Sequence, residues 1–233
     1  MNIVITGASS GIGYQTALLL SELNHLVIAV SRNKEKLDQL KTDSQKRNPS
    51  AKLLIIPGDI AQQNVVAKIT EAIKAKVDQI DILINNAGLL INKPFSELTS
   101  KDWRDSYDVN VFGTVHIIGE LLPMMKPGSH IVNISSMGGF QGSVKFKGLS
   151  CYSSAKAALV NLTECLAEEL KDRKIAVNCL CLGSVQTEMF ATAFPSMKAV
   201  SSAEEIAQFI AQFAISGQHY FNGKIIPVSN STP

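Results

Sequence analysis

The chain has 233 residues, of which 45% are hydrophobic and 18% are charged, and its formal net charge is +2. This length and apolar content suffice for a full hydrophobic core, and an α/β sheet of this size forms one domain. The small net charge, without a long run of like charges, argues against a nucleic-acid or membrane-surface partner. No apolar stretch is long enough to span a bilayer.

The N-terminus begins directly with MNIVITG, a strand-like segment without a basic region, an apolar leader or a cleavage site. We therefore expect a mature cytoplasmic protein. The cysteines form no CxxC motif, and Cys179 and Cys181, two positions apart in an apolar run, are expected to be small core residues. The histidines are scattered without a ligand-like pairing, so we predict no metal site.

Apolar runs alternate with amphipathic segments along the whole chain. The runs are rich in Val, Ile and Leu without clean alternation, which is typical of strands covered on both faces. The predicted strands are Ile3–Ile5, His25–Ser31, Lys52–Pro57, Ile80–Asn85, His130–Ser135, Ala176–Cys181 and Lys224–Val228. The predicted helices are Gly11–Leu23, Lys34–Arg47, Gln62–Lys76, Thr99–Met124, Ser150–Lys171 and Ala203–Ile215. This succession predicts a single doubly wound α/β domain, a parallel sheet of about seven strands with helices on both faces.

The first predicted strand runs into the glycine-rich turn TGASSGIG. Gly7, Gly11 and Gly13 allow a tight turn, a close approach of a phosphate to the backbone, and close packing of the next helix. That helix offers its free N–H groups and the positive end of its dipole to a pyrophosphate. The spacing is GxxxGxG rather than GxGxxG, and glycine-rich turns also occur without a ligand. Its place between the first strand and the first helix favours nucleotide binding.

The end of the second predicted strand carries Ser31 and Arg32. In dinucleotide folds an acidic residue at this point accepts hydrogen bonds from the ribose hydroxyls, whereas a nearby arginine accommodates a 2′-phosphate. A serine does not repel the extra phosphate, and Arg32 can hold it through two hydrogen bonds. The pair favours NADP(H) over NAD(H), which stays possible, and the alternative is a solvated arginine at a strand end.

The third and fourth predicted strands also end in polar residues. Asp59 follows the third strand, where it can accept a hydrogen bond from an adenine amino group or cap the next helix. The sequence NNAG, from Asn85 to Gly88, ends the fourth strand and suits a close cofactor approach, although Asn–Gly turn chemistry explains part of it.

The segment CYSSAKAALVNLTECLAEEL places a tyrosine and a lysine at the start of a helical pattern. Tyr152 and Lys156 stand at positions i and i+4, which lie on one face of a helix. A free tyrosine titrates near ~10, and a nearby cation lowers this pKa towards the range that acid–base catalysis needs. An isolated YxxxK pattern is common, so its meaning depends on the rest of the chain.

The motifs TGASSGIG, NNAG, ISS and YSSAK follow one another in the order and near the spacing of the short-chain dehydrogenase/reductase family. The chain resembles this family over essentially its whole length, in the type with a short N-terminus. The resemblance implies a Rossmann-type fold in which residues 1–233 form one NAD(P)-binding oxidoreductase domain. It also implies a nicotinamide cofactor and hydride transfer between a carbonyl and an alcohol.

The resemblance assigns roles to four residues as the catalytic set. Tyr152 matches the catalytic tyrosine, Lys156 the lysine that binds the nicotinamide ribose, and Ser136 the serine that hydrogen-bonds the substrate oxygen. Asn110 matches the asparagine whose backbone positions a water in the proton relay. Further cofactor contacts, beside Arg32, Tyr152 and Lys156, are implied for Gly7, Ser9, Ser10, Gly11, Ile12, Gly13, Asp59, Ile60, Asn86, Ala87, Gly88, Gly183, Val185 and Thr187.

The chain departs from the family pattern at several points, none of which removes a catalytic group. The sequence GSVKFKG adds residues between Ser136 and Tyr152, and Leu182 replaces the usual proline before Gly183. The substrate loop after Thr187 is short, so the pocket is expected to be open or completed by a partner subunit. Ser10 is not the basic residue of many NADP-dependent members, which leaves Arg32 as the main support for that preference.

The expected function is reduction of a carbonyl compound to an alcohol by NADPH, or the reverse. The residues expected to line the pocket are mostly apolar and suggest a hydrophobic substrate: Leu89, Leu90, Phe140, Val144, Phe146, Met189 and Phe190. Wide apolar faces on the helices near Thr99–Met124 and Ser150–Lys171 favour a homodimer or homotetramer. The alternatives are a catalytically silent nucleotide-binding regulator or scaffold, and a lyase-like epimerisation through transient oxidation with a retained cofactor.

Overall fold

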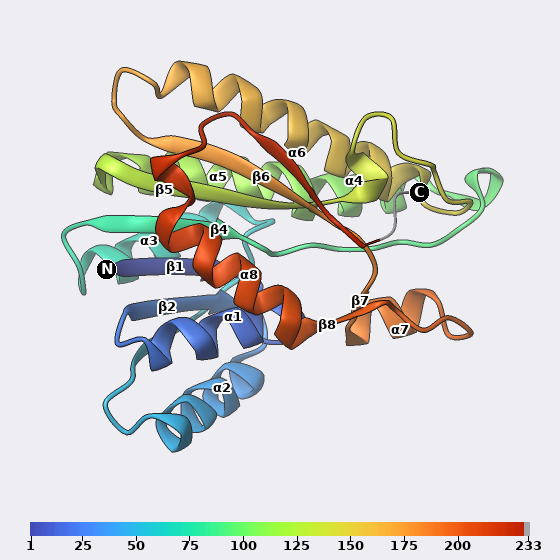
Figure 1. Ribbon diagram of the computed structural model, residues 1–233. Coiled ribbons are helices and arrows are strands. Elements are labelled where there is room, and N and C mark those ends of the chain that lie inside the picture. Colours follow the sequence, from blue (N-terminus) through green and yellow to red (C-terminus); the bar gives the residue numbers. More distant parts are fainter. Residues whose placement is uncertain (231–233) are drawn as a thin grey trace.

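A parallel sheet forms the centre of the protein in a computed structural model that describes residues 1–230 (Figure 1). Its seven strands follow the order β3-β2-β1-β4-β5-β6-β9, and every pair is parallel. The strands are β1 Asn2–Thr6, β2 Leu26–Ser31, β3 Lys52–Pro57, β4 Ile80–Asn85, β5 Met125–Ser136, β6 Ala176–Leu182 and β9 Ile225–Val228. This confirms the predicted doubly wound sheet.

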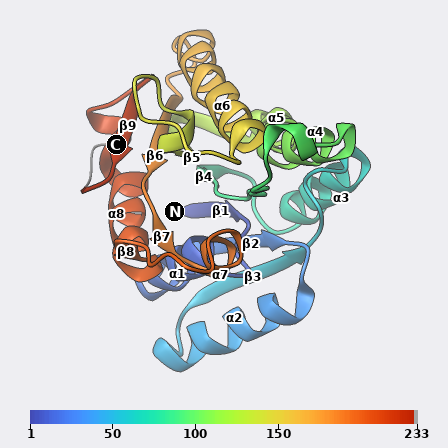
Figure 2. The ribbon, with the colours of Figure 1, turned by 90° about the vertical axis from the view of Figure 1, so that its right-hand side faces the viewer.

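Helices cover both faces of the sheet (Figure 2). One layer holds α1 Gly11–Glu22, α2 Lys34–Arg47 and α8 Ala203–Ser216; the other holds α3 Gln63–Lys74, α4 Ser100–Tyr107, α5 Gly113–Leu121 and α6 Ser150–Glu169. Successive strand residues point to opposite faces, so Val4 belongs to one hydrophobic core and Ile5 to the other. Two apolar faces explain why the strands lack polar alternation.

The single helix predicted for Thr99–Met124 is wrong, because the structure divides this segment. A π-helical turn, Asp108–Phe112, separates α4 from α5, and a 3₁₀ turn follows α5. Pro123 lies in that last turn, where a proline is tolerated, as it is not inside a longer helix. The strand β5 then begins at Met125 rather than at His130. Apolar periodicity runs through the π turn unchanged, so the sequence pattern did not reveal it.

The segment between β6 and α8 contains more structure than the short loop expected from the sequence. The strands β7 Val185–Gln186 and β8 Ser201–Ser202 form a separate two-stranded ladder, and α7 Glu188–Ala193 lies between them. In Figure 1 this segment projects beyond the carboxyl ends of the central strands. A helix of one to two turns is too short for hydrophobic periodicity to reveal.

The four cysteines, all within the described part of the chain, are free, and Cys179 and Cys181 are buried in β6. Residues 1–230 contain no group of His, Cys, Asp and Glu side chains that could hold a metal ion. No helix among these residues is long and apolar enough to cross a membrane.

A buried histidine in β5 joins this strand to α8 and β6. His130 is fully buried, with Nδ1 3.0 Å from the Ala214 carbonyl oxygen and Nε2 3.0 Å from Asn178 Nδ2. The Asn178 amide is held on both sides, because it also donates to the Phe221 carbonyl and accepts from the Lys224 N–H. These partners suit a neutral imidazole that donates through Nδ1 and accepts at Nε2.

Burial lowers the pKa of His130 from 6.5 to about 4. The unfolded chain therefore takes up the proton first as the pH falls, and stability is full above the unfolded pKa and lost below it. Between neutral pH and about pH 4.5, we expect His130 to remove roughly 2–3 kcal/mol of the free energy of unfolding. Urea denaturation of the wild type and His130→Gln at both pH values measures this loss. An equal pH dependence in both proteins would contradict the assignment.

Candidate active site at the carboxyl edge of the sheet

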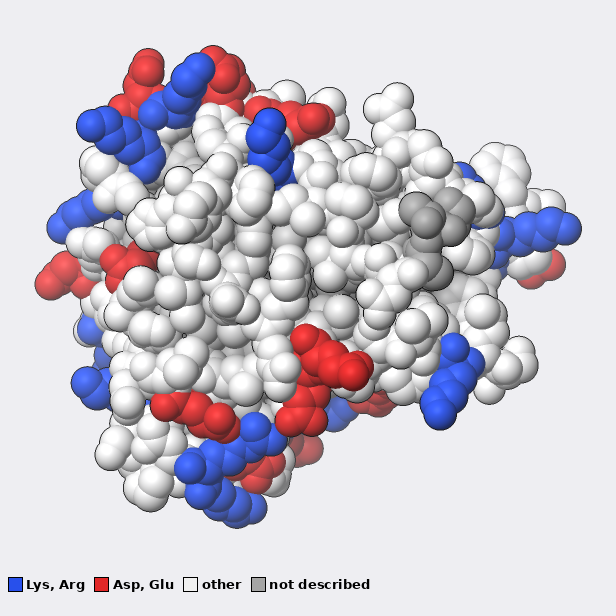
Figure 3. Space-filling view, in the orientation of Figure 1, with Lys and Arg blue, Asp and Glu red and all other residues white. Residues whose placement is uncertain are grey.

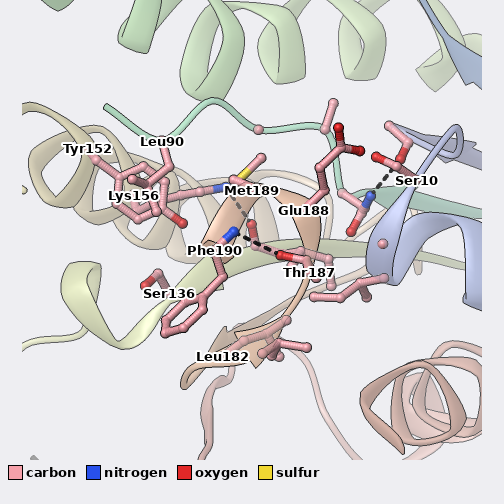
Figure 4. A pocket seen from close by; sticks show the side chains of 18 of the residues that line it. Ser10, Leu90, Ser136, Tyr152, Lys156, Leu182, Thr187, Glu188, Met189 and Phe190 are labelled. Carbon is pink, nitrogen blue, oxygen red and sulfur yellow. Dashed lines mark hydrogen bonds between the residues drawn. The ribbon is translucent and has the colours of Figure 1, made fainter. Parts of the chain in front are cut away.

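A cavity of about 580 Å³ opens at the carboxyl ends of the central strands (Figure 4). It lies where the strand order reverses, between β1 and β4, which is the usual ligand position in doubly wound sheets. The turn after β1 and the ends of β2, β3 and β4 line one part of it, and residues of β5, α6 and α7 line the other.

The turn after β1 is locked against the end of β4. Gly7 has a φ of +68°, and a β-carbon there would lie 2.7 Å from the Ala87 Cα. Gly13 lies behind the turn, where a β-carbon would meet the Gly7 carbonyl oxygen at 2.5 Å. The Asn86 amide donates to the carbonyl oxygens of Thr6 and Gly7. The glycines therefore leave a cradle that a side chain would fill, and this cradle fits a phosphate against the N-terminus of α1.

The end of β2 supplies hydroxyl groups and a cation to the cavity. The Ser9 and Ser31 hydroxyls lie 2.7 Å apart, and Arg32 beside them is exposed. The Arg32 guanidinium has no hydrogen bond or ion pair within residues 1–230. A free cation beside two hydroxyls is a suitable place for an additional phosphate.

Asp59 lines the cavity after β3. Its Oδ1 accepts a hydrogen bond from the Ala61 N–H at 3.1 Å, and the N-cap position of α3 is taken by Gln62. The alternative that Asp59 caps the next helix is therefore not what the structure shows.

The catalytic set expected from the sequence meets at the inner end of the cavity. The start of α6 carries Tyr152, whose phenol lies near the Ser136 hydroxyl at the end of β5. Lys156 lies one turn further along α6, only 3% exposed, and its Nζ donates to the Ile134 carbonyl at 2.9 Å. The same Nζ lies 5.9 Å from the centroid of the Tyr152 ring.

Burial dominates the electrostatics of this pair. It raises the pKa of Tyr152 to about 12, although the hydrogen bond with Ser136 opposes the rise. It also lowers the pKa of Lys156 to about 8. The sequence led us to expect a lowered tyrosine pKa, whereas desolvation of the phenolate raises it in this structure. The tyrosine is thus a protonated group beside a hydroxyl, and can donate a proton to an oxygen between them.

Asn110 lies behind the cavity wall rather than on it. From the π turn, its amide donates to the carbonyls of Leu89, after β4, and of Ser106, in α4, and it accepts from the Leu89 N–H. A β-carbon on Gly88 would lie 3.1 Å from Asn110 Oδ1 and 3.4 Å from Lys156 Nζ. Asn110 and Lys156 therefore both lie close to Gly88.

The structure gathers nearly all of the predicted cofactor contacts around one cavity. Only Gly13 does not line it. The lining members are Gly7, Ser9, Ser10, Gly11, Ile12, Arg32, Asp59, Ile60, Asn86, Ala87, Gly88, Tyr152, Lys156, Gly183, Val185 and Thr187. Their contacts with a cofactor stay predictions.

The apolar end of the cavity differs in part from the expected lining. Leu90, Phe146, Met189 and Phe190 line it as expected, whereas Leu89, Phe140 and Val144 do not. The Leu89 backbone is tied to Asn110, Phe140 packs beside buried residues of β6, and Val144 is 57% exposed. Sequence reasoning missed the additional lining residues Leu149, Phe194, Met197, Lys198 and Val200.

The segment around α7 brings most of these missed residues to the cavity. The rings of Phe190 and Phe194 stand 5.1 Å apart, which matches their spacing of one helical turn. This i, i+4 aromatic pair was the one signal in the sequence that could have indicated a helix there.

Sequence comparisons place the chain among known oxidoreductases. A family model described as short chain dehydrogenase matches residues 1–198. An uncharacterized oxidoreductase of Staphylococcus aureus is 31% identical over 231 residues, which cover 97% of this chain and 95% of that protein. The fatty acyl-CoA reductase of Acinetobacter baylyi is 34% identical over 212 residues, which cover 89% of this chain and 70% of the reductase.

Solved structures share the fold. L-sorbose reductase from Gluconobacter frateurii, complexed with NADPH and L-sorbose, has a TM-score of 0.90 at 24% identity, over 99% of this chain and 95% of its own. An NADPH-bound short chain oxidoreductase from Pseudomonas aeruginosa, described as containing an atypical catalytic center, has a TM-score of 0.90 at 25% identity, with the same coverage of 99% and 95%.

The close approach of Gly13 to the Gly7 backbone predicts the effect of adding one methyl group at Gly13. In Gly13→Ala the new carbon would lie 2.5 Å from the backbone of Gly7, so we expect a loss of about 1–3 kcal/mol in stability and weaker nucleotide binding. Gly119→Ala is the matched control, because nothing lies within 4 Å of a β-carbon there and alanine favours a helix. Thermal unfolding and a nucleotide titration measure both effects. Equal stability and equal nucleotide affinity of the two variants would contradict the close packing at Gly13.

Proposed function

The chain belongs to the short-chain dehydrogenase/reductase family and is an oxidoreductase, and from this premise we propose that it reduces a hydrophobic carbonyl compound to an alcohol, or catalyses the reverse, with NADP(H) preferred over NAD(H). The observation that carries the proposal is the meeting of Tyr152, Ser136 and Lys156 at one end of a cavity whose other end has a phosphate cradle and a free arginine.

The residues of the cavity fit a nicotinamide dinucleotide. The backbone at Gly7 and Gly11 would hold the pyrophosphate, Lys156 the nicotinamide ribose, and Arg32 the 2′-phosphate. The bound nicotinamide supplies or accepts the hydride at the substrate carbon. The family resemblance adds Thr187 and Val185, which also line the cavity, as contacts of the nicotinamide part.

The proton needed by the substrate oxygen comes from this chain. Ser136 holds the oxygen through its hydroxyl, and Tyr152 donates the proton, because burial keeps the phenol protonated at neutral pH. Lys156 supplies a cation next to the phenolate that remains, and the Asn110 backbone would connect the pair to water. In the oxidative direction the same groups remove the proton.

Apolar side chains around the substrate end support a hydrophobic substrate. Leu90, Leu149, Met189, Phe190 and Phe194 all line the cavity there. The similarity to a fatty acyl-CoA reductase, at 34% identity, points in the same direction. The substrate itself is proposed only at the level of this chemical class.

The proposal includes a homodimer or homotetramer of single-domain chains, each formed by residues 1–233. Phe112, beside α5, is 48% exposed, and Val115 on α5 is exposed as well. Figure 3 shows a broad area without charged side chains over α8 and β9, where Phe209 and Tyr220 are exposed. Both areas suit contact with a second copy. A cytoplasmic location stays a prediction of the sequence.

The alternative of a catalytically silent regulator receives no support. A nucleotide-binding scaffold has no need for a tyrosine, a serine hydroxyl and a buried lysine that line the same cavity. The comparisons also match enzymes.

Removal of the phenol oxygen tests the catalytic assignment. In Tyr152→Phe we expect NADPH binding to persist and turnover to fall by roughly 10²–10⁴-fold, the usual contribution of a general acid. Stopped-flow NADPH oxidation with a panel of apolar aldehydes, ketones and acyl thioesters measures turnover, and fluorescence titration measures binding. Tyr107→Phe is the control, since Tyr107 does not line the cavity. Turnover at the wild-type rate in Tyr152→Phe would refute the mechanism.

A second test concerns the choice of cofactor. We expect the wild type to bind NADPH at least about tenfold more tightly than NADH, a difference of about 1.4 kcal/mol. Arg32→Ala removes most of this difference, because the guanidinium is free to pair with the phosphate. Arg104→Ala, on α4 and outside the cavity lining, is the control. Equal affinities of the wild type for both cofactors would show that Arg32 does not discriminate between them.

A further inference from the structure

An ion pair links the start of α2, which follows Arg32, with the start of α7, which lines the cavity. Lys36 Nζ lies 2.8 Å from Glu188 Oε2, across a separation of 152 residues. Lys36 is in the first turn of α2, just after Arg32, and Glu188 is the first residue of α7. Glu188 lines the cavity, and Figure 4 shows it beside Ser10 of the phosphate turn.

Both partners are held in place by the starts of their helices. Asn33 caps α2 through its side chain, which accepts from the Lys36 N–H at 2.9 Å. Thr187 caps α7 and accepts from the Phe190 N–H at 3.2 Å. The Thr187 methyl group also lies 3.1 Å from where a β-carbon on Gly11 would be. The α7 segment therefore crosses close above the phosphate turn and presents Glu188 to Lys36.

The Lys36–Glu188 pair reduces the positive charge near the end of β2. Arg32 and Lys36 are both cations in this region, and Glu188 neutralises one of them. The hydrogen bond from Lys36 lowers the pKa of Glu188, so the carboxylate is charged at neutral pH. A carboxylate beside this site also repels any further anion.

We propose that Lys36 is a second cation for the 2′-phosphate of NADP(H), and that Glu188 competes with this phosphate for it. The Lys36–Glu188 pair then sets how strongly the protein discriminates between NADP(H) and NAD(H). The inference rests on the proposed use of NADP(H). It adds a residue pair to which the glycine-rich turn and the Ser31–Arg32 pattern do not point.

An exchange of partners by Lys36 is energetically accessible. The two side chains are 47% and 71% exposed, and an exposed ion pair contributes little free energy. A phosphate carries more negative charge than one carboxylate and offers three acceptor oxygens. NADH has no such group and leaves the pair intact. Lys36 therefore gains a stronger partner only when the 2′-phosphate is present.

The two residues have opposite expected effects on NADPH binding. Lys36→Ala should weaken it by roughly fivefold or more, because a charge-assisted hydrogen bond to phosphate is lost. Glu188→Gln should strengthen it by roughly threefold, because a competitor and a repulsive charge are removed. Neither substitution should change NADH affinity by more than about twofold. In the Lys36→Ala background, Glu188→Gln should have a smaller effect, because the competition is gone.

The experiment is a fluorescence titration of NADPH and NADH with the wild type, both single variants and the double variant. Lys34→Ala is the matched control, since Lys34 forms an exposed ion pair with Asp38 on the same helix, whereas the partner of Lys36, Glu188, lines the cavity. Competition by 2′,5′-ADP and by 5′-AMP reports the adenosine end alone, without nicotinamide or turnover. Lys36→Ala is expected to weaken the binding of 2′,5′-ADP and to leave the binding of 5′-AMP unchanged.

The outcomes separate this inference from the proposed function. If the wild type shows no NADPH preference but Lys36→Ala still weakens 2′,5′-ADP selectively, the proposed preference fails and the inference holds. Suppose instead that the wild type prefers NADPH, but the Lys36 and Glu188 variants change the affinities for NADPH and NADH equally or change neither. The inference is then overturned and the proposed function stands. Failure of the wild type to bind any of the four nucleotides overturns both.

Discussion

The close contact between the turn after β1 and the end of β4 is the constraint on which the site depends. Gly7 and Gly13 have no room for a β-carbon against Ala87 and the backbone of the turn itself. Asn86 then ties both segments together by donating to the Gly7 carbonyl. Because these strands are neighbours where the strand order reverses, the contact lies at the usual ligand position of a doubly wound sheet. A nucleotide cradle follows from this packing and not from any single residue type.

Burial is the second constraint, and it acts on charge. Desolvation raises the pKa of the Tyr152 phenol and lowers that of the Lys156 ammonium, which is only 3% exposed. A protonated phenol next to the Ser136 hydroxyl is suited to giving a proton to an oxygen that becomes negative. Same-face spacing on a helix brings the two groups together, but the sign of the pKa change is decided by desolvation.

The segment around α7 determines what surrounds the ligand. It brings Phe190 and Phe194 to the substrate end of the cavity and Glu188 to the nucleotide end. One short element thus connects the apolar pocket with the charges beside Arg32. It is tied to the rest of the fold by Thr187 over the phosphate turn, by the Lys36–Glu188 pair, by a hydrogen bond from Asn92 to the Ala193 carbonyl, and by the ladder of β7 and β8.

The sequence by itself determined the doubly wound sheet, since apolar runs and helical periodicity are local patterns. Nearly every residue that it implied as a cofactor contact lines the cavity, because Gly7, Arg32 and Asp59 each follow a strand and parallel strands end at one edge. Only the tertiary structure decided the π turn at Asn110, the short helix α7 and the pairing of Glu188 across the cavity. Their physical reason is shared: each depends on contacts between segments distant in the chain, and such contacts leave no periodic signal in the sequence.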